Sequence, residues 1–159
     1  ERQEGSSTGT GSAGHAVPER QVMFVGTFDR SIDAKGRLAL PPKFRSRLSD
    51  GGYVSTMQTC LGLWTPEGFE EMAQRLEELA REGKLDQAVP RNFFGFAEDV
   101  SIDAQGRISL PARLRDSAQL DRDATLIGRN TRIEIFSPAA WHEQEDTAAV
   151  ASAFEAMAL

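Results

Sequence analysis

The sequence predicts a mainly β fold with peripheral helices (α+β), built from two copies of one small motif. The first observation is a repeat: the fifteen residues that begin at Ser31 and the fifteen that begin at Ser101 are identical at nine positions. The second is a period of two in the residues before the first copy, which is typical of a strand. The third is an Asp-Ala-x-Gly turn in each copy. Because two copies are too few for a solenoid, we expect a pseudo-twofold pair that closes on itself.

The first strand of each half is predicted from this alternation. In the first half, one face of the strand carries Phe24, Gly26, Phe28, Arg30 and Ile32. In the second half, the corresponding face is expected to carry Phe94, Phe96, Glu98, Val100 and Ile102.

A tight turn follows each first strand, at Asp33-Ala34-Lys35-Gly36 and Asp103-Ala104-Gln105-Gly106. Aspartate suits the first position of a type I turn, where its side chain accepts a backbone N–H two residues ahead. We expect Gly36 and Gly106 to have positive φ, which a side chain would resist. A short strand then returns in each half and ends at a proline, after which a short helix can follow.

The rest of each half predicts a second strand pair and a helix. The strand pairs are Tyr53–Met57 with Leu61–Thr65, and Ala124–Gly128 with Arg132–Phe136. Pro66 and Pro138 each begin a helix. The predicted organisation is a disordered N-terminal tail, a first repeat, a helical connection, a second repeat and a C-terminal helix or tail, at residues 1–22, 23–82, 83–93, 94–145 and 146–159.

Charge is unevenly distributed along the chain, whose net charge is −6. Residues 30–47 carry six bases against one acid, whereas residues 67–86 carry seven acids against three bases. A basic face can therefore exist on an acidic protein. The single cysteine, Cys60, cannot form an internal disulfide, which favours a reducing cytoplasm. No stretch approaches the ~20 apolar residues that span a bilayer, so no membrane partner is expected.

The bases in and after the two turns are the candidate functional residues. Arg37 and Arg107 begin the returning strands, where they can pair with the turn aspartates or bind a phosphate. Bases then recur at matching offsets beyond each turn: Lys43 and Arg45 in the first half, Arg113 and Arg115 in the second. A basic surface repeated in this way suits a repetitive polyanion such as DNA, because Lys and Arg contacts to phosphates supply affinity through counterion release.

These residues carry a resemblance to a known family. The pattern S-[IL]-D-x-x-G-R-[LI]-x-[LI]-P-x-x-[LF]-R resembles the swapped-hairpin signature of AbrB/SpoVT-type DNA-binding domains. Two tandem copies, opened by Met23-Phe24-Val25-Gly26, resemble the MraZ family. The resemblance implies a pseudo-twofold swapped-hairpin β-barrel, a ring-like homo-oligomer and a nucleoid-associated cytoplasmic regulator. It also implies binding of spaced direct repeats in double-stranded DNA at the promoter of the protein's own division and cell-wall gene cluster, and repression from there.

Positions carried over from the family motif define the expected site. The expected DNA-binding bases are Lys35, Arg37, Lys43, Arg45, Arg107, Arg113 and Arg115. The expected turn residues are Asp33, Gly36, Asp103 and Gly106. Gln105 stands where the first copy has Lys35, so the second turn should contribute less electrostatically. No enzyme activity, cofactor, metal or small-molecule substrate is expected.

Three alternatives to DNA binding remain open. Asp33 and Asp103 could share a proton as an aspartic-protease pair does, although the cations beside them should lower both pKa values. A metal site is disfavoured because the two histidines, His15 and His142, have no cysteine pair with them. The third alternative is an AbrB-type antitoxin or another protein-binding module of the same fold.

Overall fold

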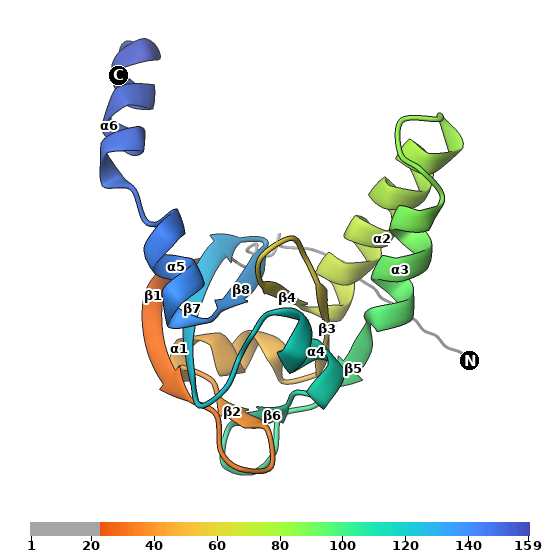
Figure 1. The fold of residues 1–159 in the computed structure, drawn as a ribbon, viewed down its shortest axis with the longest axis vertical. Helices are drawn as coiled ribbons and strands as arrows, with labels where there is room; N and C mark the ends of the chain where they lie inside the picture. Colours follow the sequence, from red (N-terminus) through yellow and green to blue (C-terminus); the bar gives the residue numbers. More distant parts are fainter. Residues whose placement is uncertain (1–22) are drawn as a thin grey trace, which may run out of the picture.

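The computed structural model describes residues 23–159, which form a β body with helices around it (Figure 1). The first half contains β1 (Phe24–Ser31), β2 (Arg37–Ala39), α1 (Pro42–Arg45), the 3-10 helix η1 (Ser46–Leu48), β3 (Gly52–Thr56), β4 (Leu61–Trp64) and α2 (Pro66–Arg81). The remaining elements are α3 (Ala88–Phe96), β5 (Glu98–Val100), β6 (Arg107–Ser109), α4 (Ala112–Ser117), β7 (Asp123–Asn130), β8 (Arg132–Phe136), α5 (Pro138–Gln144) and α6 (Thr147–Ala156). The prediction of a mainly β fold with helices is confirmed. The predicted tail, residues 1–22, lies outside the described residues.

The two halves exchange strands throughout the β body. β1 of the first half pairs antiparallel with β7 of the second, and β5 of the second half pairs with β3 of the first. The β4–β8 and β2–β6 ladders also join the halves. The six-stranded sheet has the order β1-β7-β8-β4-β3-β5, in which equivalent strands of the two halves take equivalent places from either edge. Each half therefore completes the hydrogen bonding of the other.

This sheet is open. Among residues 23–159, β1 and β5 form its two edges and are not paired with each other, so the expectation of a closed barrel is not confirmed. The prediction of a long first strand in the second half is wrong, because Phe94 and Phe96 belong to α3 and β5 has only three residues. In the helix, Phe93 stacks on Phe69 of α2 at 5.7 Å and Phe94 meets the same ring edge-on at 6.2 Å. This aromatic packing favours the helix over an extended strand.

Matching residues of the two halves build the core. The returning strands and the short helices after them bury Leu38, Leu40 and Phe44 from the first half and Ile108, Leu110 and Leu114 from the second. Each of these side chains is at most 2% exposed, and burial of such a side chain stabilises the fold by about 1.5–3 kcal/mol. The core therefore lies directly behind the two turns and holds their strands in place.

Two helical arms leave the β body on opposite sides (Figure 1). One is the antiparallel pair of α2 and α3, and the other is α5 followed by α6. As predicted, prolines begin α2 and α5, where the Thr65 and Ser137 hydroxyls accept backbone N–H groups at 3.0 and 3.1 Å. No helix within residues 23–159 is long and apolar enough to cross a bilayer.

Candidate nucleic-acid interface

The two predicted turns lie side by side at one end of the molecule, away from the helical arms (Figure 1). The β2–β6 ladder brings them together by pairing Leu38 with Ile108. The ladder continues into the turns, because the Leu40 N–H donates to the Gly106 carbonyl and the Leu110 N–H donates to the Gly36 carbonyl, both at 2.9 Å. Residues that are seventy positions apart in the sequence thus share one surface.

Each turn has the geometry that its sequence predicts. Gly36 and Gly106 have φ values of 80° and 78°, in the left-handed region that favours glycine. One oxygen of Asp33 accepts the backbone N–H groups of Lys35 and Arg37, both at 2.9 Å. Asp103 accepts the equivalent two N–H groups at the same distances. Capping of the turns therefore gives each aspartate a structural role, and no catalytic role is needed to explain it.

The second oxygen of each aspartate binds an arginine. Arg37 Nε lies 2.7 Å from Asp33 Oδ2, and Arg107 Nε lies 2.9 Å from Asp103 Oδ2. Arg107 Nη1 also lies 3.6 Å from Asp33 Oδ2, which links the two turns. The pKa of each aspartate is lowered, chiefly by the backbone N–H of the arginine and further by its side chain. Two carboxylates held ionised in this way lack the raised pKa that an acid catalyst needs at neutral pH.

The remaining predicted bases lie in three different settings. Lys35 is exposed on the first turn, and Gln105 takes the equivalent place on the second. Lys43 and Arg113 are exposed and lie against aromatic rings: Lys43 Nζ is 5.7 Å from the Phe28 ring centroid and Arg113 Cζ is 4.2 Å from that of Phe96.

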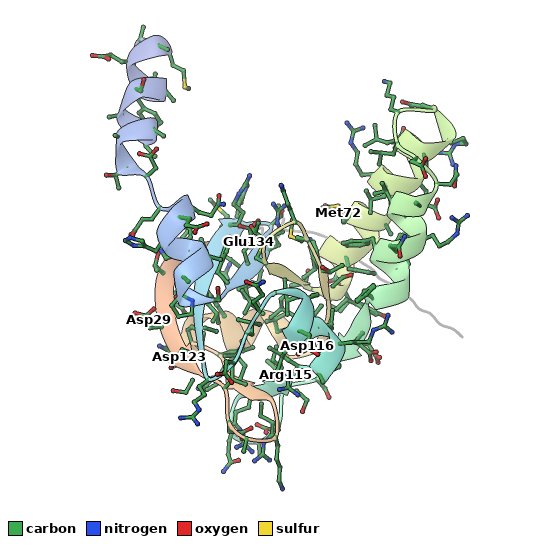
Figure 2. All side chains as sticks on the ribbon, in the orientation of Figure 1. Asp29, Met72, Arg115, Asp116, Asp123 and Glu134 are labelled. Carbon is green, nitrogen blue, oxygen red and sulfur yellow. The ribbon has the colours of Figure 1, made fainter. Side chains whose placement is uncertain are left out.

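Arg45 and Arg115 lie behind the turns and are half-buried. Arg45 Nε donates to the Leu40 carbonyl at 2.8 Å, and Arg115 Nε donates to the Leu110 carbonyl at 2.9 Å. Figure 2 shows Arg115 on α4 just above the two turns. Both guanidinium groups are thus already engaged with the backbone.

One base near the turns was missed by the sequence reasoning. Arg122 lines a hollow beside the first turn together with Asp33 and Arg115, and its carbonyl accepts the Ile32 N–H at 2.7 Å. Asp121 and Asp123 line the same hollow, so it has no net positive charge; Figure 2 labels Asp123 close to Arg115. The repeat gave no signal for Arg122, because no base recurs at that place in the first half.

Within residues 23–159, no three His, Cys, Asp or Glu side chains come close enough together to hold a metal ion. His142 is exposed on α5, and His15 lies outside the described residues.

Comparison with known proteins gives the family. The family model described as "MraZ protein, putative antitoxin-like" matches the chain twice, at residues 23–92 and 93–158. A "Transcriptional regulator MraZ" of Salinispora arenicola is 42% identical over 130 residues, which cover 78% of this chain and 91% of the relative. A protein of the same name from Desulfitobacterium hafniense is 37% identical over 139 residues, covering 85% of this chain and 96% of the relative. The chain, with its two tandem repeats, belongs to the MraZ family.

Proposed function

We propose that this protein is a DNA-binding transcriptional regulator whose two paired turns contact the duplex. The observation that carries the proposal is the juxtaposition of Arg37 and Arg107, one from each half, on neighbouring exposed turns linked through Asp33. The relatives that match most of the chain are named as transcriptional regulators. This combination supports a nucleic-acid surface over a catalytic one.

The chemistry of the two arginines fits this role. Each arginine binds the aspartate of its own turn through Nε, and Arg107 also approaches Asp33 through Nη1. Within residues 23–159, the terminal nitrogens of Arg37 form no hydrogen bond or ion pair. A guanidinium held in this way keeps donors for a phosphate oxygen or for the edge of guanine in the major groove, which is wide enough for a β-ribbon. The aspartate fixes the direction of the arginine, so little side-chain entropy is lost on binding.

Affinity from one protomer should be low. The first turn carries Lys35 and Arg37, whereas the second carries only Arg107, on a chain with a net charge of −6. Contacts of this kind give dissociation constants of about 10⁻⁴–10⁻⁶ M at physiological salt, and several linked protomers can gain ~10²–10⁴ through avidity. We therefore infer that an oligomer binds spaced direct repeats in the DNA. The promoter we propose is that of the protein's own division and cell-wall gene cluster, whose transcription the oligomer represses in the cytoplasm, at the nucleoid.

The helical arms support self-association. α6 has ten residues and stands away from the β body, yet an isolated helix of this length is marginal in water. Val150 and Phe154 on this helix and Met157 directly after it are all more than half exposed. On the opposite arm, a groove beside α2 is lined by Ala73, Gln74, Glu77, Arg81 and Phe94. An exposed apolar helix on one flank and a different surface, this groove, on the other suit a head-to-tail contact between copies, which can close into a ring.

The DNA proposal is tested by measuring affinity for the protein's own upstream DNA across a series of salt concentrations. We compare the wild type with Arg37→Ala, Arg107→Ala and the double variant, and use Arg75→Ala, an exposed arginine on α2, as a matched control. Loss of each phosphate contact should flatten the plot of log K against log salt by about one. The aspartates left behind are solvent-accessible, so the variants should stay folded, which circular dichroism checks. Unchanged affinity and slope in the folded double variant would overturn the proposal.

Self-association is tested separately, by measuring the oligomer mass with light scattering and by comparing the affinity for DNA with one repeat and with several repeats. Phe154→Asp should reduce the oligomer mass and remove the preference for several correctly spaced repeats, while Glu155→Gln on the same helix should change neither. Equal affinity of the wild type for one repeat and for several would contradict the oligomeric mode of binding.

A further inference from the structure

Arg45 and Arg115 occupy equivalent places, each at a junction between the two halves. Arg45 Nε binds the carbonyl of Leu40, the residue that follows β2, and Arg115 Nε binds the carbonyl of Leu110, which follows β6. The N–H groups of the same two leucines donate to the turn glycines of the opposite half. Each arginine is therefore fixed to its own half by the residue that joins that half to the other.

The guanidinium groups reach across this junction. A Cβ atom added to Gly106 would overlap Arg45 Cζ, Nε and Nη1, and one added to Gly36 would lie 3.0 Å from Arg115 Cζ and Nε. Arg45 of the first half thus packs on the turn of the second, and Arg115 of the second half packs on the turn of the first. A glycine at each turn leaves a flat peptide surface on which a planar guanidinium can lie.

From this crossed arrangement we infer that Arg45 and Arg115 are positioning residues for the DNA-contacting turns of the opposite half. Arg45 holds the turn that carries Arg107, and Arg115 holds the turn that carries Arg37. The role differs from the direct DNA contact that the sequence led us to expect for these two arginines. What the turns bind rests on the proposed function, whereas the crossed packing itself does not.

The repeat explains why two arginines recur at this position. Gly36 and Arg45 have the same sequence separation as Gly106 and Arg115. Within one half, the arginine lies in the short helix after the returning strand, and the turn glycine on which it packs belongs to the other half. Strand exchange between the halves places the turn of the opposite half beside this arginine. A guanidinium offers a fixed plane and a directed Nε–H, neither of which lysine provides.

The test is hydrogen exchange of the unliganded protein in Arg45→Ala and Arg115→Ala variants. Arg45→Ala should speed exchange of the Leu40 and Gly106 amides by about ten- to a hundredfold, as expected for loss of a hydrogen bond to a charged group, and leave Gly36 within about twofold. Arg115→Ala should give the mirror result at Leu110 and Gly36. Lys43→Ala and Arg113→Ala, two residues earlier on the same helices, are matched controls that should change neither turn.

DNA binding supplies a second readout. When Arg115→Ala is combined with Arg37→Ala, the fold-loss of DNA affinity should be smaller than the product of the two single fold-losses. When Arg115→Ala is combined with Arg107→Ala, the fold-loss should equal that product. Arg45→Ala should show the opposite pattern. Arg115→Lys should resemble Arg115→Ala, since the charge alone does not restore the packing.

Two results would overturn the inference. Faster exchange at both turns in each single variant would indicate a merely structural role. Unchanged exchange, with a salt slope flattened by about one, would assign the arginines to phosphate contact. Failure of the wild type to bind DNA would overturn the proposed function but not the crossed packing, because the exchange pattern is measured without DNA.

Discussion

Substitution of Gly106 by alanine tests the packing of Arg45 on the second turn. Two costs follow from the structure. The φ of 78° places an L-residue in the left-handed region, at a cost of roughly 1–2 kcal/mol. The new Cβ would also displace the end of Arg45, whose Nε–H bond to the Leu40 carbonyl is worth roughly 1.5–3 kcal/mol because the donor is charged. We therefore expect the free energy of unfolding to fall by roughly 2.5–5 kcal/mol.

Gly83 supplies the matched control. Its φ of 76° is nearly the same, but nothing lies within 4 Å of the position that a Cβ would occupy. Gly83→Ala should therefore pay the conformational cost alone, and the effect of the substitution on the unfolded chain is common to both variants. The difference between Gly106→Ala and Gly83→Ala, measured by urea denaturation with equal m-values, isolates the contribution of Arg45 at roughly 1.5–3 kcal/mol.

The same pair of variants can also contradict the packing of Arg45 on the second turn. Equal losses of stability in Gly106→Ala and Gly83→Ala would mean that Arg45 moves aside without cost. Its bond to Leu40 would then contribute nothing to holding the turn, and the reasoning about crossed packing would fail.

Three further predictions follow from individual contacts. Because the pKa values of Asp33 and Asp103 are lowered, their contribution to stability is present above the ordinary aspartate pKa and lost as the pH falls through the lowered values. The urea midpoint of the wild type should therefore drop on acidification, and it should drop less steeply in the Asp33→Asn, Asp103→Asn double variant. Parallel pH profiles of the two proteins would contradict this prediction. Burial raises the pKa of the Cys60 thiol to about 12, so a thiol reagent at pH 8 should modify the native protein far more slowly than the protein in urea; rapid stoichiometric labelling of the native protein would be the opposing result. Thr65→Ala and Ser137→Ala should each cost about 1 kcal/mol of unfolding free energy by removing a helix N-cap, while Thr65→Ser should retain most of the stability; no loss in Thr65→Ala would rule out a contribution from the cap.

The local elements were largely predictable because their signals are local. Asp33 and Gly36 define the first turn by side-chain capping and by φ, and the same residue types define the second turn. Proline after Thr65 and Ser137 marks the start of two helices. In each case the residues that carry the information are within a few positions of the structure they specify.

The misassigned strand shows where local reasoning failed. Phe94 and Phe96 alternate as strand residues do, but tertiary packing decides their conformation. Phe93 and Phe94 reach Phe69 of α2, and the Asp86 carboxylate accepts the Ala88 N–H at 2.7 Å at the start of α3. A period of two over so few residues cannot distinguish a strand from a helix when the deciding partner lies on another element.

The roles of the bases were the least predictable part of the site. Recurrence at equal offsets picked out Arg37 with Arg107 and Arg45 with Arg115, but it could not distinguish an arginine bound to a turn aspartate from one packed behind a turn. That distinction depends on strand exchange, which brings Arg45 to Gly106 of the other half. Arg122 stayed hidden because Asp33, its neighbour in space, belongs to the other half of the chain and is distant in sequence.

Hydrogen exchange with and without the upstream DNA tests whether DNA lies across the two paired turns. The backbone amides of residues 33–37 and 103–107 should exchange more slowly in the complex, while those of α2 on the far arm should be unchanged. Protection confined to α2, or absent from both turns at saturating DNA, would contradict the account.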